Sequence, residues 1–230
     1  MCGVIGLRCE KDRRDLGATA ARLLRMLEYR GYDSTGAAVQ AEDGTITLRK
    51  DVGSPTEVCR RLDIPSLSGS VFCGQVRWAT FGKVDRANAQ PHQVYCKTHL
   101  YGAHNGNITN CAGLKKKLRR LGHRVLSDND GEMLVHLVEH HFDLALRRTP
   151  DRARALKAAV LKTARELVGS YAAVIVDPKT RTLAAIKAGS SLYMGLGHCE
   201  DGAAAPTHTP MGRGPGPSGA GAGAASSFII

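Results

Sequence analysis

Two hairpin-like stretches constrain the fold of this chain most. Residues 36–42 and 45–53 read GAAVQAE and TITLRKDVG, and the turn residues Asp43 and Gly44 separate them, which is typical of a β-hairpin. Residues 170–189, SYAAVIVDPKTRTLAAIKAG, have the same character. Because hairpins build antiparallel sheets, we predict an α+β fold of stacked antiparallel sheets flanked by helices, and not a parallel doubly wound sheet.

The segments around these hairpins predict further helices and single strands. Apolar residues recur at helical spacing in some of them, and short apolar runs bounded by turn residues mark the others. The predicted helices cover residues 15–31, 55–62, a segment from about 110, 131–146 and 151–169, and the predicted strands cover 2–9, 70–78, 93–97 and 99–106.

Composition limits the class of protein. A chain of 230 residues with 43% hydrophobic content is long enough for one sizeable core. The sequence contains no run of 18 apolar residues and no signal-peptide pattern, so we expect a cytoplasmic protein with no membrane contact. Seven cysteines without a C-x-x-C pair argue against a disulfide framework and a zinc ribbon.

The formal charge of +11 raises the question of nucleic-acid binding. The densest basic run, LKKKLRRLGHR at 114–124, places Leu114, Leu118 and Leu121 on one side of a helix, so its charges form a solvated outer face. Aromatic residues, which stack on bases, make up only 5% of the chain. We expect no nucleic-acid partner, and a basic RNA-binding module remains the alternative of a different class.

The last 33 residues differ in composition from the rest. Residues 198–230 are dominated by Gly, Ala, Pro and Ser, which bury too little apolar surface to offset the entropy of ordering. We therefore predict a domain over residues 2–197 and a disordered tail over residues 198–230.

Cys2 is the first candidate for chemistry. Removal of Met1 would place a thiol and a free amine on one residue. An N-terminal amine has a reference pKa of about 7.7 to 8.0 and can serve as the base for its own nucleophile. One cysteine at position 2 is also compatible with chance, so the remaining segments must supply the other parts of a site.

Three further segments supply groups that an amide-cleaving thiol needs. Arg77 can hold a carboxylate with two hydrogen bonds, and Trp78 and Thr80 follow it. Asn105 and Gly106 offer a side-chain amide and an accessible backbone N–H for a developing oxyanion. Each has an ordinary structural explanation: Arg77 as a surface residue and Asn-Gly as a turn.

Two acidic residues and a histidine-rich helix complete the candidates. Either Asp128 or Asp130 could pair with a substrate ammonium, although such residues also cap helices. His136, Glu139 and His140 raise the question of a metal site, but the sequence lacks H-E-x-x-H and shows no further ligand segment, so we expect no metal and no other cofactor.

Six motifs in order carry a family resemblance over residues 2–197: MCGVIGL, LEYRGYDSTG, VRWATFG, NAQPH, GAHNGNITN and SDNDGE. They resemble the glutamine amidotransferase domain of the glutamine-fructose-6-phosphate aminotransferase family, which is class II and uses an N-terminal nucleophile. The AHNGN motif is also similar to amidophosphoribosyltransferase. The resemblance implies a four-layer αββα sandwich of the N-terminal-nucleophile hydrolase type.

The resemblance also implies roles for individual residues. Cys2 would attack the glutamine amide, form a glutamyl thioester and release ammonia, with its own amine as the base. Asn105 and Gly106 would form the oxyanion hole. Glutamine contacts would fall on Arg77, Trp78, Thr80, Gly106 and Asp130, Arg30 would support the site, and residues 77–85 would form a lid.

The chain departs from the family pattern in two ways. Gln75, Phe81 and Gln90 stand where the family usually has histidines. The family enzyme also continues into a sugar-isomerising part that this sequence does not contain. We therefore expect glutamine hydrolysis as part of amino-sugar synthesis with an isomerase domain or acceptor protein in trans, and the alternatives are a stand-alone glutaminase or a module for another acceptor such as phosphoribosyl pyrophosphate.

Overall fold

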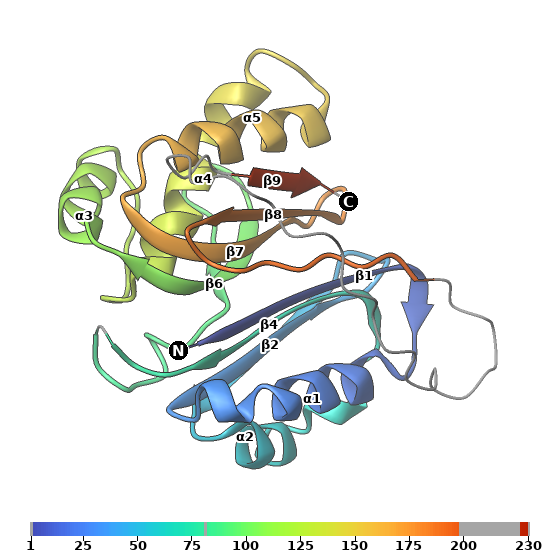
Figure 1. Cartoon of the computed structure of the whole chain (residues 1–230). Coiled ribbons are helices and arrows are strands. Elements are labelled where there is room, and N and C mark those ends of the chain that lie inside the picture. The colour runs from blue at the N-terminus through green and yellow to red at the C-terminus, as the bar shows by residue number, and fades with distance from the viewer. Residues whose placement is uncertain (1, 81, 198–225, 230) are drawn as a thin grey trace, which may run out of the picture.

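Two antiparallel sheets lie face to face between two layers of helices in the computed structural model, which describes residues 2–80, 82–197 and 226–229 (Figure 1). The first sheet has the strand order β1-β4-β2-β3 and the second has the order β5-β6-β7-β8-β9. Together with the helices on their outer faces, the sheets form the four-layer αββα sandwich that was expected.

The first third of the chain builds the first sheet and its helices. Its elements are β1 (Gly3–Arg13), α1 (Leu16–Met26), the 3₁₀ helix η1 (Glu28–Arg30), β2 (Ser34–Gln40), β3 (Ile46–Val52), α2 (Pro55–Arg61), the 3₁₀ helix η2 (Ile64–Ser66) and β4 (Gly69–Arg77). The predicted hairpin is confirmed as β2 and β3. The single helix predicted over residues 15–31 ends at Met26, and a short 3₁₀ turn follows it.

The rest of the chain builds the second sheet and its helices. Its elements are β5 (His92–Val94), β6 (Leu100–Ile108), α3 (Cys111–Arg120), α4 (Asp130–Leu146), α5 (Arg152–Ala164), β7 (Gly169–Asp177), β8 (Thr182–Ala188) and β9 (Ser226–Ile229). The predicted hairpin is confirmed as β7 and β8, and the predicted helices near 110, 131–146 and 151–169 are α3, α4 and α5.

Strand β9 differs from the expectation for the tail. Its residues pair antiparallel with β8, and Ser227 lies opposite Ile186. The prediction of a disordered segment is therefore wrong for residues 226–229, because these four residues complete an open sheet edge with backbone hydrogen bonds. Residues 198–225 and 230 lie outside the described residues.

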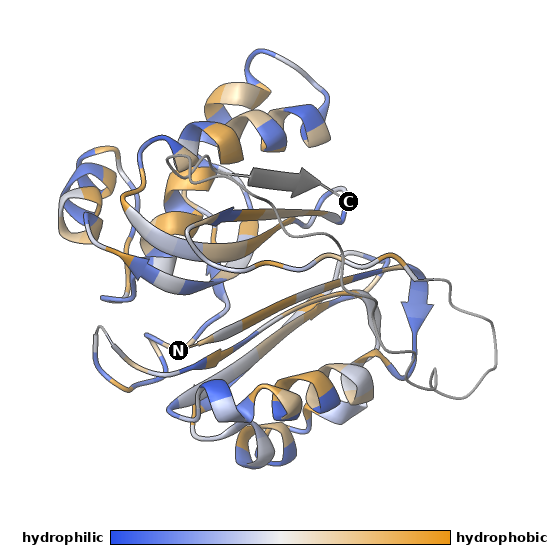
Figure 2. Cartoon of the chain, viewed as in Figure 1, coloured by the Kyte–Doolittle hydropathy of each residue, from blue (hydrophilic) through white to orange (hydrophobic). Residues whose placement is uncertain are grey.

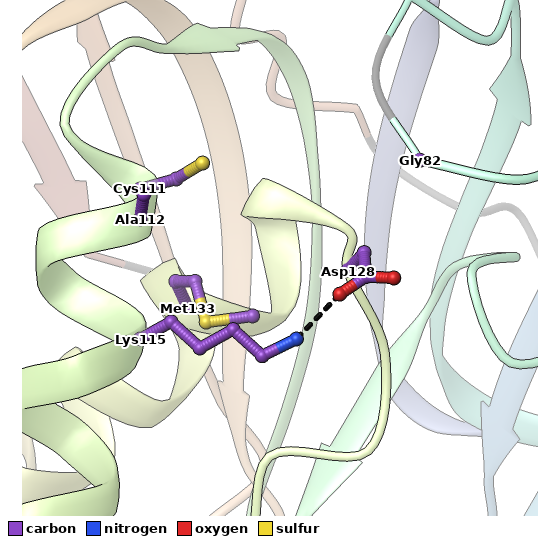
Figure 3. Close-up of a pocket in the computed structure, with 6 residues that line it drawn as sticks. All are labelled: Gly82, Cys111, Ala112, Lys115, Asp128 and Met133. Atoms are coloured by element: carbon purple, nitrogen blue, oxygen red, sulfur yellow. Dashed lines mark hydrogen bonds and ion pairs between the residues drawn. The ribbon is translucent and has the colours of Figure 1, made fainter.

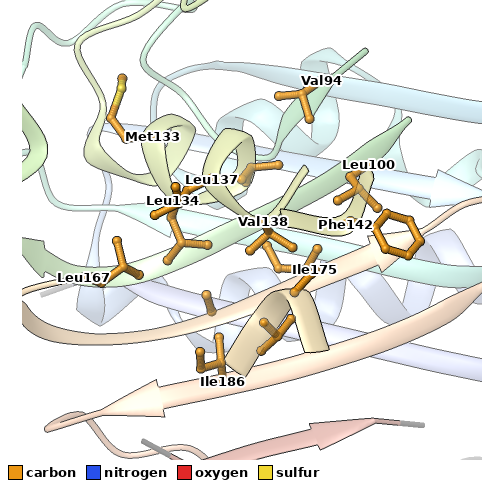
Figure 4. Close-up of a cluster of buried hydrophobic side chains, with 14 of the residues drawn as sticks. Val94, Leu100, Met133, Leu134, Leu137, Val138, Phe142, Leu167, Ile175 and Ile186 are labelled. Atoms are coloured by element: carbon orange, nitrogen blue, oxygen red, sulfur yellow. The ribbon is translucent and has the colours of Figure 1, made fainter. Parts of the chain in front are cut away.

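Three buried clusters hold the layers together. One packs α1 and α2 against the first sheet through side chains such as Leu24 and Phe72, and a second lies between the sheets around Tyr101. The third packs α4 and α5 on the second sheet, and Figure 4 shows Leu134 and Val138 of α4 beside Ile175 of β7. In Figure 2 the hydrophobic faces of the helices lie toward the sheets. Among the described residues, no helix combines the length and apolar character needed to cross a bilayer.

Candidate active site

Cys2 lies at the end of the first sheet. Strand β1 begins at Gly3 opposite Val76, so Cys2 is next to the end of β4. The thiol Sγ is 3.4 Å from both the backbone N–H and the carbonyl oxygen of Trp78. The Arg30 guanidinium donates a hydrogen bond of 3.0 Å to the carbonyl of Cys2, which links the η1 turn to the residue before β1.

The charges of two proposed site residues, Arg77 and Asp130, act on the Cys2 thiol. Burial raises the pKa of Cys2, while the Trp78 N–H and the Arg77 charge lower it and the Asp130 charge raises it. Arg77 follows Val76 at the end of β4, and Asp130 begins α4 on the other sheet's side. The site therefore combines a residue of the first sheet with a residue of a helix that packs on the second sheet.

Arg77 is buried, with 2% of its surface exposed, so the surface-residue alternative is wrong. Its Nη1 donates to the carbonyl of Lys83 at 2.9 Å and its Nη2 to that of Gly82 at 3.5 Å. These contacts tie the following loop back onto the strand end. Gly31 makes room for this strand end, because a Cβ there would lie 2.5 Å from the Arg77 carbonyl carbon.

The loop after β4 presents its side chains to solvent. Trp78 and Thr80 are both exposed. The Trp78 ring lies 5.5 Å from the Tyr32 ring, centroid to centroid, and the Ala79 N–H donates to Asp33 Oδ2 at 2.7 Å. The loop is thus fixed at its start on the segment between η1 and β2. Phe81, one of the three departures from the family pattern, lies outside the described residues.

Asn105 and Gly106 are part of strand β6, so the Asn-Gly turn alternative is wrong. They lie opposite Ala172 and Tyr171 of β7. Gly106 has φ +139°, a region that disfavours other residues, and a Cβ there would meet the Ser170 carbonyl oxygen at 2.1 Å. Only glycine fits this position, and both residues are half-buried.

Of the two acidic candidates, Asp130 is buried and Asp128 is exposed. Asp130 Oδ2 accepts from the Ile108 N–H at 2.9 Å and lies 3.2 Å from His104 Nε2. Burial raises the pKa of Asp130, but His104 and the N–H donor outweigh it, so the pKa lies below its usual value. Asp128 instead forms an exposed ion pair of 2.5 Å with Lys115.

Gln75 and Gln90, two positions where the resemblance leads one to expect histidines, both contact His104. Gln90 Oε1 accepts from the His104 backbone N–H at 2.8 Å, and Gln90 Nε2 lies 3.1 Å from His104 Nδ1. Gln75 Nε2 donates to the His104 carbonyl at 3.5 Å. Both glutamines therefore lie behind Asp130, on the histidine that holds its carboxylate.

A pocket of about 320 Å³ lies between the loop after β4, α3 and the start of α4, and neither Cys2 nor Asp130 is among the residues that line it (Figure 3). Its lining comes from three segments: Gly82 of the loop after β4, Cys111 and Lys115 of α3, and Asp128 and Met133 around the start of α4. The Asp130 charge raises the pKa of Cys111 in addition to burial, so this wall lies close to Asp130. The pocket therefore reaches from the loop to the α4 N-terminus.

Sequence reasoning missed a buried polar group behind the site. His92 Nε2 lies 3.3 Å from Asn129 Oδ1, and Asn129 caps α4 by accepting from the Gly131 N–H at 2.9 Å. Burial, reinforced by the Lys50 charge, lowers the pKa of His92 to about 3. The signal was the NAQPH motif, which ends in this histidine.

The comparisons with known proteins agree with this geometry. A family profile described as a glutamine amidotransferase domain matches residues 77–201. Glutamine--fructose-6-phosphate aminotransferase [isomerizing] of Sulfurisphaera tokodaii is 36% identical over 197 residues, which are 86% of this chain and 32% of that protein. The enzyme of the same name from Pyrobaculum aerophilum is 39% identical over 199 residues, 86% of this chain and 31% of that protein. The chain thus spans about a third of the length of these relatives.

A solved structure supports the fold. The glutamine phosphoribosylpyrophosphate amidotransferase of B. subtilis, complexed with ADP and GMP, superposes with a TM-score of 0.62 at 26% identity, over 82% of this chain and 37% of that one. The chain belongs to the class II glutamine amidotransferase domains, and its sandwich is of the N-terminal-nucleophile hydrolase type, as the motifs predicted.

Proposed function

We propose that residues 2–197 hydrolyse glutamine to glutamate and ammonia, with Cys2 as the nucleophile after removal of Met1. The observation that carries the proposal is the position of the Cys2 thiol, 3.4 Å from the Trp78 N–H and close enough to Arg77 and Asp130 for both charges to act on it. These residues come from segments far apart in sequence, and the fold brings them to one end of the sandwich.

The reaction follows from the groups present. The Cys2 amine takes the thiol proton as sulfur attacks the amide carbon of the glutamine side chain. When the carbon–nitrogen bond breaks, the amine returns the proton and ammonia leaves. Water then attacks the resulting thioester, which releases glutamate and restores the thiol. Because burial raises the pKa of Cys2, the thiol is protonated at neutral pH and needs a base to remove its proton as sulfur attacks.

The other residues bind glutamine and stabilise the oxyanion of the intermediates. Asn105 and Gly106 hold the oxyanion of each tetrahedral intermediate, Arg77 holds the glutamine carboxylate, and Asp130 holds its ammonium. The lowered pKa of Asp130 supports this role, since it keeps the carboxylate charged. Trp78 and Thr80, at the start of the exposed loop, close over the bound amino acid.

The ammonia acceptor is proposed from the relatives. The 36–39% identity to glutamine--fructose-6-phosphate aminotransferases favours a ketose phosphate as the ammonia acceptor over the phosphoribosyl pyrophosphate of the structural relative at 26% identity. On its own, the chain should release ammonia into solution and form no amino sugar.

A glutaminase assay tests the proposal. We expect ammonia and glutamate from the purified chain whose first residue, by N-terminal sequencing, is Cys2, and no product from Cys2→Ser. Arg77→Lys should raise KM more than it lowers kcat, because an ammonium cannot make the two-pronged contact, and Arg22→Lys on the exposed face of α1 is the matched control. Full activity in Cys2→Ser, or in a preparation that retains Met1, would contradict the mechanism.

A further inference from the structure

A second cluster of reactive side chains lies on the other face of α4, away from the glutamine site. Cys96, His123, His136 and Glu139 each offer one ligand atom, and these four atoms all lie within 4.8 Å of one another. His123, His136 and Glu139 are buried, and Cys96 is partly accessible. Sequence reasoning named two of these residues and found no further ligand segment. The fold supplies the missing two.

Three elements converge to build the cluster. His136 and Glu139 are three residues apart on α4 and so share one helix face. Cys96 lies in the connection between β5 and β6. His123 follows α3, where Gly122 has φ +83° and the His123 N–H donates to the Leu118 carbonyl at 2.9 Å, which is a Schellman motif that fixes its backbone.

Glu139 lies at the centre of the cluster. Its Oε2 is 3.0 Å from His123 Nδ1 and 3.1 Å from His136 Nδ1. Its Oε1 is held from the opposite side by the Lys97 N–H at 2.7 Å. One carboxylate oxygen is therefore fixed by backbone, and the other faces both imidazoles.

The outward-facing atoms of the cluster have partners of the kind that orient metal ligands. His136 Nε2 lies 3.6 Å from Glu132 Oε1, and His123 Nε2 lies 3.4 Å from His140 Nδ1. The Arg124 N–H donates to Cys96 Sγ at 3.1 Å. A ligating histidine normally donates its second ring N–H to a carboxylate or another acceptor, and a backbone N–H favours a thiolate.

We propose that Cys96, His123, His136 and Glu139 bind one Zn²⁺ ion, which joins α4 to the β5–β6 connection and to the end of α3. One thiolate and one carboxylate neutralise the two charges of the ion, and two neutral imidazoles complete four ligands of the types that zinc prefers. With bonds of about 2.0 to 2.3 Å, the four ligand atoms of a tetrahedral zinc lie roughly 3.3 to 3.8 Å apart. The ligand atoms here lie within 4.8 Å of one another, so the widest pair would close by about 1 to 1.5 Å, and Glu139 Oε2 would move a few tenths of an ångström away from each imidazole, from 3.0 and 3.1 Å.

Binding has a defined proton balance. The Cys96 thiol loses its proton to solvent when its sulfur bonds to zinc. Each imidazole bonds through Nδ1 and keeps its ring proton on Nε2, where Glu132 and His140 accept it. The alternative is a purely hydrogen-bonded cluster, in which the two Nδ1–H groups donate to Glu139 and no metal enters.

Zinc content and cobalt spectroscopy separate the two cases. The chain carries no affinity tag and has Cys2→Ser, so that neither a tag nor the nucleophile contributes a ligand. We expect about one zinc ion per chain after dialysis, a rise of several degrees in Tm on adding zinc to the metal-free protein, and, with Co²⁺, a thiolate charge-transfer band and the intense visible absorption of four-coordinate cobalt.

Matched variants locate the ion. Cys96→Ser and His136→Asn should reduce zinc retention to about a tenth or less and abolish the Tm rise, whereas Cys9→Ser and His99→Asn should behave as the parent. Should the ligand variants fail to fold, the parent alone decides, because its X-ray absorption must show one sulfur and three nitrogen or oxygen neighbours. A parent that retains no zinc and shows no Tm shift, or variants that bind as the parent does, would overturn the proposal.

Discussion

Asp130 and His104 form a buried contact between α4 and β6, with 3.2 Å between Asp130 Oδ2 and His104 Nε2. Gln90 holds the other side of the imidazole, and Gly131 permits the arrangement, because a Cβ there would lie 2.4 Å from His104 Nδ1. Gln90 therefore acts through His104 on the Asp130 carboxylate, which we propose binds the substrate ammonium.

The first prediction tests that chain of contacts. Gln90→Leu removes the side-chain hydrogen bonds to His104 while keeping a similar volume, so the glutamine KM should rise several-fold with little change in kcat, since roughly 1 kcal/mol of support is lost. Steady-state kinetics measure this, and Gln93→Leu in β5 is the control. Equal KM values for the two variants would show that His104 holds Asp130 without help.

The second prediction concerns thiol reactivity. Because burial raises the pKa of Cys2, the thiol of a chain extended by two residues at its N-terminus should react with iodoacetamide more slowly at pH 7 than a free cysteine does. The mature chain, with its amine on Cys2 itself, should react faster than the extended one. Peptide mass spectrometry follows the modification at Cys2, and identical rates in both chains would argue against the amine as base.

The third prediction is a pH dependence of stability. Burial raises the pKa of Glu132, but His136 and the N–H groups of Leu126 and Ser127 outweigh it and hold the pKa at about 2. A depressed pKa contributes stability that is fully present above the ordinary value of about 4.3 and is lost as the pH falls toward 2.

Urea unfolding of metal-free protein between pH 7 and pH 3 measures this contribution. Glu132→Gln should lower the free energy of unfolding at pH 7 by on the order of 2 kcal/mol and flatten its decline below pH 4.5. Glu10→Gln, at an exposed position of β1, should do neither. A parallel decline in Glu132→Gln and the parent would place the acid sensitivity elsewhere.

The fourth prediction contrasts two glycines. Gly106→Ala forces a Cβ to within 2.1 Å of the Ser170 carbonyl oxygen at φ +139°, so we expect a loss of about 2 kcal/mol or more of stability and of glutaminase activity. Gly113→Ala, within α3 with nothing within 4 Å of the new methyl, should instead stabilise by about 0.5 to 1 kcal/mol. Thermal unfolding of both variants distinguishes them by sign.

The fifth prediction tests strand β9. Ser227→Pro removes a backbone donor from the strand that pairs with β8, so it should lower Tm by several degrees, whereas Ser227→Ala keeps the N–H and should not. A chain ending at Gly197 should resemble the proline variant and should also aggregate more readily, since β8 becomes an open edge. If all three chains have the Tm of the parent, β9 does not contribute to the stability of the fold.

The sequence predicted the order of elements well because the signals were local. Turn residues and alternation identified both hairpins, and helical spacing identified α3, α4 and α5. Strand β9 was missed because its four residues have no strand signal that outweighs the surrounding Gly, Ala and Pro, and the hydrogen bonds of an edge are supplied by its neighbour β8.

The sequence predicted which residues belong to the candidate site, but not the contacts that hold them in place. Resemblance named Asp130, yet the reason why Asp130 rather than Asp128 is buried is the contact with His104 on another strand, which no local pattern contains. The same holds for Cys96 and His123, which become neighbours of α4 only when β5 and α3 pack against it.

The order of strands has a further consequence. The first sheet uses residues 3–77 and the second uses residues 92–229, so between the two sheets the chain crosses at residues 78–91, the segment that holds Trp78 and Thr80. A backbone cut at Lys83 would therefore yield two consecutive fragments, each with a complete sheet and its own helices. Such fragments could be produced separately and reassembled, and recovery of glutaminase activity on mixing would then report docking of the sheets, because neither fragment holds both Cys2 and Asp130.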